Sequence, residues 1–105
     1  MNDDSALPVR RPKQEPLVIR VASKTKVGSL ATSLLMKLKE GHQLELNCIG
    51  PASISQAVKA VAALNGQLGV NGNCALLQPF LRNQTLEDES PSVMVGFRLS
   101  VHASS

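Results

Sequence analysis

The chain has 105 residues, a hydrophobic fraction of 43% and a formal net charge of +3, which leaves room for one small domain with a single core. Its opening residues lack the basic and then apolar pattern of a secretory signal, and no apolar run approaches the length of a membrane span. We therefore expect an intracellular protein, cytoplasmic or associated with the nucleus or nucleoid.

Residues 1–16 hold several prolines and charges but no periodic apolar pattern. This composition predicts a flexible tail, followed by one domain over residues 17–105. Arg10, Arg11 and Lys13 make the tail basic, so it would add phosphate contacts, although a solvated leader is the simpler interpretation.

The first half of the domain alternates between strand and helix patterns. Strands are expected at Leu17–Ala22 and Gln43–Ile49, on either side of a helix over Val27–Glu40 whose apolar residues recur at i, i+3, i+4 and i+7. A second helix is expected from Ser53, as its N-cap, to Asn65.

The second half of the domain predicts two more strands. One spans about Cys74–Leu81, with Pro79 placing its end at a sheet edge, and a polar acidic connection follows over Arg82–Pro91. The last strand, Ser92–His102, alternates strictly. Its expected core residues are Val93, Val95, Phe97, Leu99 and Val101.

The order β-α-β-α-β-β predicts an α/β two-layer sandwich with a four-stranded sheet. Short crossovers are right-handed, so both helices should lie on one face of that sheet. Phe80 and Phe97 are the only aromatic residues, so we expect an aliphatic core and no surface aromatic platform for stacking on bases.

Lys59 is the only charge in the second helix, whose expected outer face carries small or uncharged residues. These outer residues are Ser55, Gln56, Ala60 and Ala63. Such a surface permits close approach of another helix, so we expect a homodimer or higher homo-oligomer. A helix covered within its own domain is the alternative.

The sequence contains no constellation typical of catalysis. His42 and His102 lie outside any metal-ligand or triad motif, and Glu87–Glu89 fall in a loop. Cys48 and Cys74 lie in apolar runs without CxxC spacing, which favours buried thiols. We expect no enzyme activity, no catalytic residues, no metal and no cofactor.

Residues 22–29 form the strongest candidate binding site. Lys24 and Lys26 stand beside the start of the first helix, where free N–H groups and the positive end of the helix dipole attract anions. This combination suits a phosphate backbone. An ordinary solvated loop with two lysines is the alternative.

The run IGPASISQAVKAVA, from Ile49 to Ala62, resembles the stage V sporulation protein S family, in which I-G-A-x-A-x-x-Q-A-V-K-A-V-A opens the second helix. Leu17–Val27 is similar to the family's first strand and loop, and Leu76–Phe80 to its I-x-P-x-F element. The resemblance covers about Leu17–Val101.

This resemblance implies an Alba-like fold, similar to the C-terminal domain of translation initiation factor three, and a dimer that binds DNA or RNA. Alba proteins use the first strand–helix loop, where Lys24 and Lys26 stand, together with the start of the second helix and the last hairpin. Two of these regions depart from the pattern: Gly50–Ala52 stand where Alba has arginines, and Glu87–Glu89 make the hairpin acidic.

We therefore expect a non-enzymatic, regulatory nucleic-acid-binding protein with low sequence specificity. The residues expected to contact phosphates are Lys24, Lys26, Lys59, Arg10, Arg11 and Lys13. The acidic hairpin and the uncharged second helix favour the alternative, a self-associating regulatory module that binds protein instead of nucleic acid.

Overall fold

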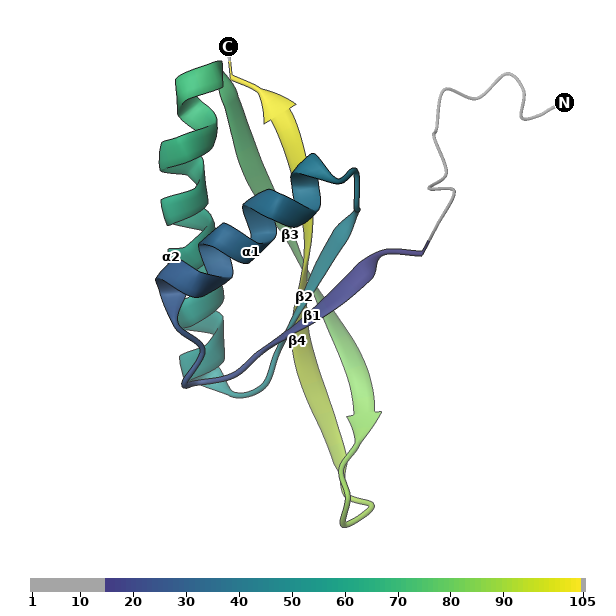
Figure 1. Ribbon diagram of the computed structural model, residues 1–105. Helices are drawn as coiled ribbons and strands as arrows, with labels where there is room; N and C mark the ends of the chain where they lie inside the picture. Colours follow the sequence, from purple (N-terminus) through teal and green to yellow (C-terminus); the bar gives the residue numbers. More distant parts are fainter. Residues whose placement is uncertain (1–14, 105) are drawn as a thin grey trace, which may run out of the picture.

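The computed structural model describes residues 15–104, and it confirms the α/β two-layer sandwich with the expected element order (Figure 1). The elements are β1 (Leu17–Val21), α1 (Val27–Lys39), β2 (Leu44–Cys48), α2 (Pro51–Leu68), a short 3₁₀ helix η1 (Gly69–Asn71), β3 (Asn73–Thr85) and β4 (Pro91–Ala103).

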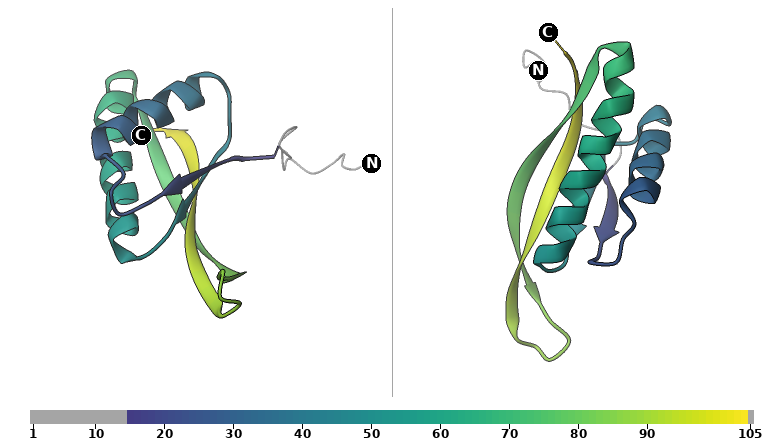
Figure 2. Two further views of the ribbon diagram at one scale, coloured as in Figure 1. Left: turned by 60° about the horizontal axis from the view of Figure 1, so that its bottom comes forward. Right: turned by 90° about the vertical axis from the view of Figure 1, so that its left-hand side faces the viewer.

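The four strands form one mixed sheet in the order β1-β2-β4-β3. β1 and β2 are parallel, and β4 runs antiparallel to both of its neighbours. Both helices pack on the same face, as the right panel of Figure 2 shows. Within the described residues no element covers the opposite face of the sheet.

The core lies between the helices and the central strands. Alternation along β2 and β4 turns Leu46 and Leu99 toward the helices, while the helical period brings Leu34 and Leu64 to meet them. Leu34, Leu46 and Leu64 are fully buried. Each buried leucine contributes roughly 1.5–3 kcal/mol, so this cluster carries much of the stability of so small a domain.

Helix α2 is longer than the sequence predicted at both ends. It begins at Pro51, a residue preset for the first helical turn, after Gly50 with φ of 87°. Ser53 is therefore not the N-cap; it is buried, and its Oγ donates to the carbonyl oxygen of Gly50 at 2.5 Å. The helix continues past Asn65 to Leu68, and the Asn65 side chain bonds both the N–H and the carbonyl of Ala75, at 2.6 and 3.2 Å.

The hairpin of β3 and β4 is also longer than expected. Pairing continues from Arg82 opposite Met94 to Thr85 opposite Pro91, which leaves only residues 86–90 as the connection. Backbone ladder bonds to β4 here outweigh the polar composition that predicted a loop. Pro79 lies within β3, where it is tolerated because β3 is an edge strand.

Two residues that the alternation assigned to the core are exposed, although Phe97 and Leu99 between them are buried. Val101 is 40% exposed and lines a hollow near the C-terminal end of β4, while Val93, near the hairpin tip, is 56% exposed. β4 outruns the part of the sheet that the helices cover, and its lower half projects freely in Figure 1. Leu81, opposite Val95 on β3, is 72% exposed for the same reason.

Candidate nucleic-acid interface

Both helices begin at the same end of the sheet. Val21, the last residue of β1, pairs with Cys48, the last residue of β2, so the loops that lead into α1 and α2 lie at one corner (Figure 1). In the described chain neither helix start has a side-chain cap or an acidic residue in its first turn. The free N–H groups and the positive dipole ends of both helices therefore attract anions to the same corner.

The loop between β1 and α1 is folded back and tied to α2. The N–H of Thr25 donates to the carbonyl of Ala22 at 3.1 Å, and the Thr25 hydroxyl accepts from the N–H of Ala22 at 2.9 Å. Gln56 Nε2 then donates to the Thr25 carbonyl at 2.7 Å. These bonds fix the loop against the start of α2.

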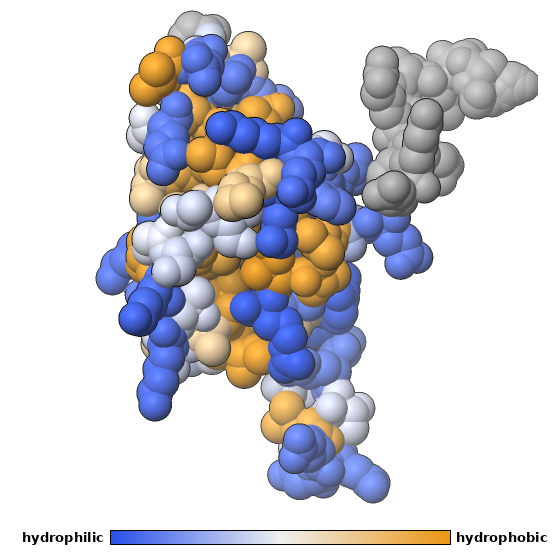
Figure 3. Space-filling view, viewed as in Figure 1, coloured by the Kyte–Doolittle hydropathy of each residue, from blue (hydrophilic) through white to orange (hydrophobic). Residues whose placement is uncertain are grey.

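Three exposed lysines lie on the segments that the hydrogen bond from Gln56 to Thr25 joins. Lys24 and Lys26 stand in the loop, and Lys59 lies one helical turn after Gln56, which holds that loop. We name residues 22–26 together with Lys59 the basic corner. Figure 3 shows hydrophilic side chains protruding there, at the lower left of the molecule. The structure thus brings together all three predicted contact residues that it describes; Arg10, Arg11 and Lys13 lie outside the described residues.

The acidic end of the hairpin projects from the same end of the sheet. We name residues 86–90 the acidic tip; its Glu87, Asp88 and Glu89 are exposed (Figure 1). Asp88 Oδ1 accepts from the hydroxyl of Ser90 at 2.5 Å and from its N–H at 3.0 Å. These hydrogen bonds lower the pKa of Asp88, so the tip keeps its negative charge at neutral pH.

The uncovered side of the sheet carries a cluster that sequence reasoning missed. Alternation and strand register place charged, polar and aromatic side chains on this side, and we name the side the arginine face after six of them. They are Arg20, Glu45, Asn47, Phe80, Arg82 and Arg98. Glu45 is only 5% exposed although no described element lies over it, and Arg82 Nη1 pairs with its Oε2 at 3.0 Å.

Phe80 lies at the centre of the arginine face. The guanidinium carbons of Arg82 and Arg98 stand 5.0 and 4.7 Å from its ring centroid, within the range of cation–π attraction. The ring rests on Gly96, where an added Cβ would come within 2.3 Å of Phe80 Cζ. Phe80 is half-buried, so one aromatic side chain does reach this open side of the sheet, where the composition predicts no surface aromatic platform.

Two further expectations about α2 need correction. Ala60, assigned to the outer face, is fully buried, and Gln56 is half-buried because it reaches back to the loop. Ser55 and Ala63 are exposed as expected. Because the buried stripe of α2 is wider than the pattern suggested, its outer surface is narrower.

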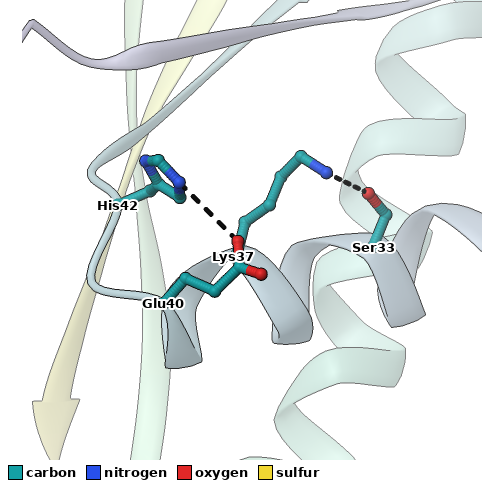
Figure 4. Close-up of polar contacts among 4 residues, drawn as sticks. All are labelled: Ser33, Lys37, Glu40 and His42. Carbon is teal, nitrogen blue, oxygen red and sulfur yellow. Dashed lines mark hydrogen bonds and ion pairs between the residues drawn. The ribbon is translucent and has the colours of Figure 1, made fainter.

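The end of the sheet opposite the basic corner holds small, separate polar contacts. Lys37 Nζ donates to Ser33 Oγ at 3.1 Å along α1, and His42 Nε2 lies 3.7 Å from Glu40 Oε1 (Figure 4). A hollow of about 1020 Å³ opens nearby between the C-terminal parts of both helices and the sheet, and its lining includes Leu35 and Leu68. Across the described chain, no three His, Cys, Asp or Glu side chains are placed to share a metal ion.

The cysteines are both free. Cys48 is buried, and burial raises the pKa of its thiol against the opposing effect of a hydrogen bond with Ser53. Cys74 is half-buried on β3.

Among the described helices, none combines the length and apolar character that crossing a bilayer requires.

The fold and the basic corner define a class: small two-layer α/β proteins in which a lysine-bearing loop and two helix N-termini meet at one end of a mixed sheet. Within that class the chain belongs to the stage V sporulation protein S family, whose sequence model matches residues 17–102. This confirms the resemblance carried by the run from Ile49 to Ala62. A comparison with curated proteins gives no match.

Proposed function

We propose that this protein binds DNA or RNA with low sequence specificity, as a regulator without catalytic activity of its own, and that it holds phosphates at the basic corner. The observation that carries the proposal is the meeting of two uncapped helix N-termini with Lys24, Lys26 and Lys59. Oriented N–H groups and mobile cations are the donors that bind phosphate oxygens. This is also the manner of binding that the Alba-like resemblance implies.

The chemistry of the basic corner supports low specificity. Lysine ammonium groups and backbone N–H groups recognise phosphates, which carry no sequence information directly. Reading a base edge needs paired donors and acceptors, such as the fork of an arginine or an amide. The one amide at the corner, Gln56, is already engaged with the Thr25 carbonyl.

We further propose that the protein works in the cytoplasm or at the nucleoid as a homodimer or larger homo-oligomer, formed in part through α2. On the exposed side of this helix Ala52, Ser55, Ala62 and Ala63 are small, and Val58 is 48% exposed. Small side chains let two helices approach closely, and an exposed valine gains from burial. A dimer would present two basic corners to one nucleic acid.

The direct test is fluorescence-anisotropy binding of duplex DNA and of single-stranded RNA over a salt series. The test variant is Lys24→Ala/Lys26→Ala, and the control is Lys37→Ala/Lys39→Ala, which removes equal charge from the opposite end of α1. If a dimer makes four phosphate contacts, log K should fall against log salt with a slope of about −3.6.

The two variants should separate clearly. We expect the loop variant to lose most of its salt-dependent affinity and to flatten the slope by roughly 1 for each phosphate contact removed, while the control changes little. A folded wild-type protein that binds neither oligonucleotide at low salt contradicts the proposal.

The acidic tip favours a second candidate function, a self-associating module that binds protein. Negative charge at the same end as the basic corner opposes a polyanion, while Leu81 and Val93 on the projecting hairpin are 72% and 56% exposed. Exposed apolar side chains beside charges are typical of protein contacts. The variant Glu87→Gln/Glu89→Gln, which spares the Asp88 turn, tests this point.

The two candidate functions predict opposite results for that variant. If the basic corner binds phosphates, removing nearby negative charge should raise nucleic-acid affinity severalfold at low salt and less at high salt. If the tip binds protein, nucleic-acid binding is absent in both forms. Light scattering at tens of micromolar then reports self-association, and a monomeric mass would contradict the oligomer.

A further inference from the structure

We propose that the arginine face is a binding surface for single-stranded nucleic acid, distinct from the basic corner. This inference rests on the proposed function and deepens it, because it names the form of nucleic acid that the uncovered sheet takes. Four features of the face carry it: uncompensated charge, two guanidinium groups over an aromatic ring, an unpaired buried acceptor and an open side of the sheet.

The charge on the arginine face is unbalanced. Among the described residues turned to this side, Glu45 is the single acid, and Arg82 already occupies it at 3.0 Å. Arg20 and Arg98 are exposed, and neither forms an ion pair within the described chain. As far as the described residues go, two guanidinium groups therefore remain free for phosphate oxygens, which they match in a bidentate manner.

The aromatic ring and its two arginines give the face a second mode of contact. Arg82 and Arg98 both lie over the ring of Phe80. The ion pair with Glu45 holds Arg82 in place. Gly96 has no side chain, so the tip of the Phe80 ring can lie close to the backbone of β4. Unpaired bases stack on aromatic rings and on arginine planes, whereas bases inside a duplex are not available for this.

An unpaired acceptor lies beside this stack. Asn47 pairs with Gly96 across the sheet, and within the described residues its buried Oδ1 has no hydrogen-bond partner. Buried polar atoms are nearly always paired. The oxygen has no exposed surface in this conformation, so the half-buried amide must turn outward to meet a ligand. The exposed edges of bases and the 2′-hydroxyl of ribose then offer it a donor, and phosphates do not.

The shape of the face suits an extended strand. Four strands contribute to it, and Val18 and Leu76 on its outer strands are 47% and 52% exposed. Arg20 stands close in sequence to the loop of Lys24 and Lys26, so a single strand that crosses the sheet can pass around β1 to the basic corner. A duplex is too stiff to follow that path.

The test compares two probes on the full chain by fluorescence anisotropy. One probe is a mixed-sequence single-stranded RNA of about 15 nucleotides, the upper range for one such surface, and the other is the duplex DNA of the same length. The test variant is Arg20→Ala/Arg98→Ala. Lys37→Ala/Lys39→Ala serves as the control of equal charge, and Lys24→Ala/Lys26→Ala reports the basic corner.

We expect Arg20→Ala/Arg98→Ala to weaken single-strand binding by about tenfold or more, because it removes both stacking and phosphate contacts. Duplex binding should change by less than about twofold, since the duplex is held at the basic corner. Arg98→Lys keeps the charge but not the plane, so it should lose affinity for the single strand and not for the duplex.

Three results would overturn the inference. Single-strand binding that survives in Arg20→Ala/Arg98→Ala while Lys24→Ala/Lys26→Ala abolishes it leaves the basic corner as the only site. An equal loss for both probes in the arginine variant shows general electrostatics instead of single-strand recognition. Absence of any binding by the wild-type protein removes the proposed function together with this inference. Circular dichroism melting confirms that each variant is folded.

Discussion

The two faces of the sheet bury side chains by different means. On the covered face Leu44 and Leu46 are at most 2% exposed because two helices lie over them. On the arginine face Glu45, between those two leucines in sequence, is also only 5% exposed. No described helix covers it, so its burial comes from side chains that reach across from β3 and β4.

On the uncovered face, side chains of the sheet itself cover Glu45. Phe80 lies on Gly96, and Arg82 passes the ring to reach Glu45. Burial on the covered face is stabilised by the non-directional hydrophobic effect, whereas burial of Glu45 depends on one ion pair with a defined geometry. The two faces should therefore respond differently to substitution.

The largest expected effect is on the covered face. Leu46→Ala removes a fully buried side chain from the central part of the sheet and leaves a cavity, which should lower the free energy of unfolding by about 3 kcal/mol. Urea denaturation measures the change. Nucleic-acid affinity at a temperature where the variant is folded should stay close to that of the wild type. A loss below about 1 kcal/mol would show that the core relaxes around the gap.

An intermediate effect is expected where the arginine face holds its buried acid. Arg82→Ala leaves Glu45 buried without its partner, and removing one member of a buried pair is costly. Arg82 is itself 46% exposed, so we expect a loss of about 2 kcal/mol, less than for a fully buried pair. The measurement is urea denaturation at neutral pH.

A matched double variant sharpens this second prediction. Glu45→Gln/Arg82→Ala removes the unpaired charge, so it should be more stable than Arg82→Ala alone. Equal stability of the single and double variants would mean that Arg82 acts through its contact with Phe80 and not through the ion pair.

Much of this fold was accessible from local patterns. The helical stripe of α1 and the crossover rule depend on neighbours in sequence, and the structure confirms both. The alternation of β4 correctly placed Phe97 and Leu99 in the core, but Val93 and Val101 are exposed and Met94 is buried. The loop lysines were found because a loop before a helix is also a local feature. The position of Lys59 beside these lysines depends on the hydrogen bond between Gln56 and Thr25, which are separated by 31 residues.

The arginine face was not accessible in that way. Glu45 and Arg82 are 37 residues apart, and their contact depends on the register of three strands. The sequence also ended β3 at Leu81, because the polar run after it looks like a loop, so Arg82 was read as part of the connection. Only pairing with β4 keeps that run extended. Long-range pairing of this kind overrides local propensity.

The smallest expected effect concerns the contact that supports the stack. In Gly96→Ala the new Cβ would come within 2.3 Å of the tip of the Phe80 ring, so the ring must shift. Overpacking that a side chain can relieve should cost about 1 kcal/mol. The displaced ring also moves away from Arg98, so single-strand affinity should fall in the same variant.

A double-mutant cycle with Phe80→Leu, read by urea denaturation, isolates the clash. Once the ring is gone, Gly96→Ala should lower the free energy of unfolding only slightly. If its cost is unchanged, the penalty arises in the backbone of β4, and the ring does not depend on the glycine.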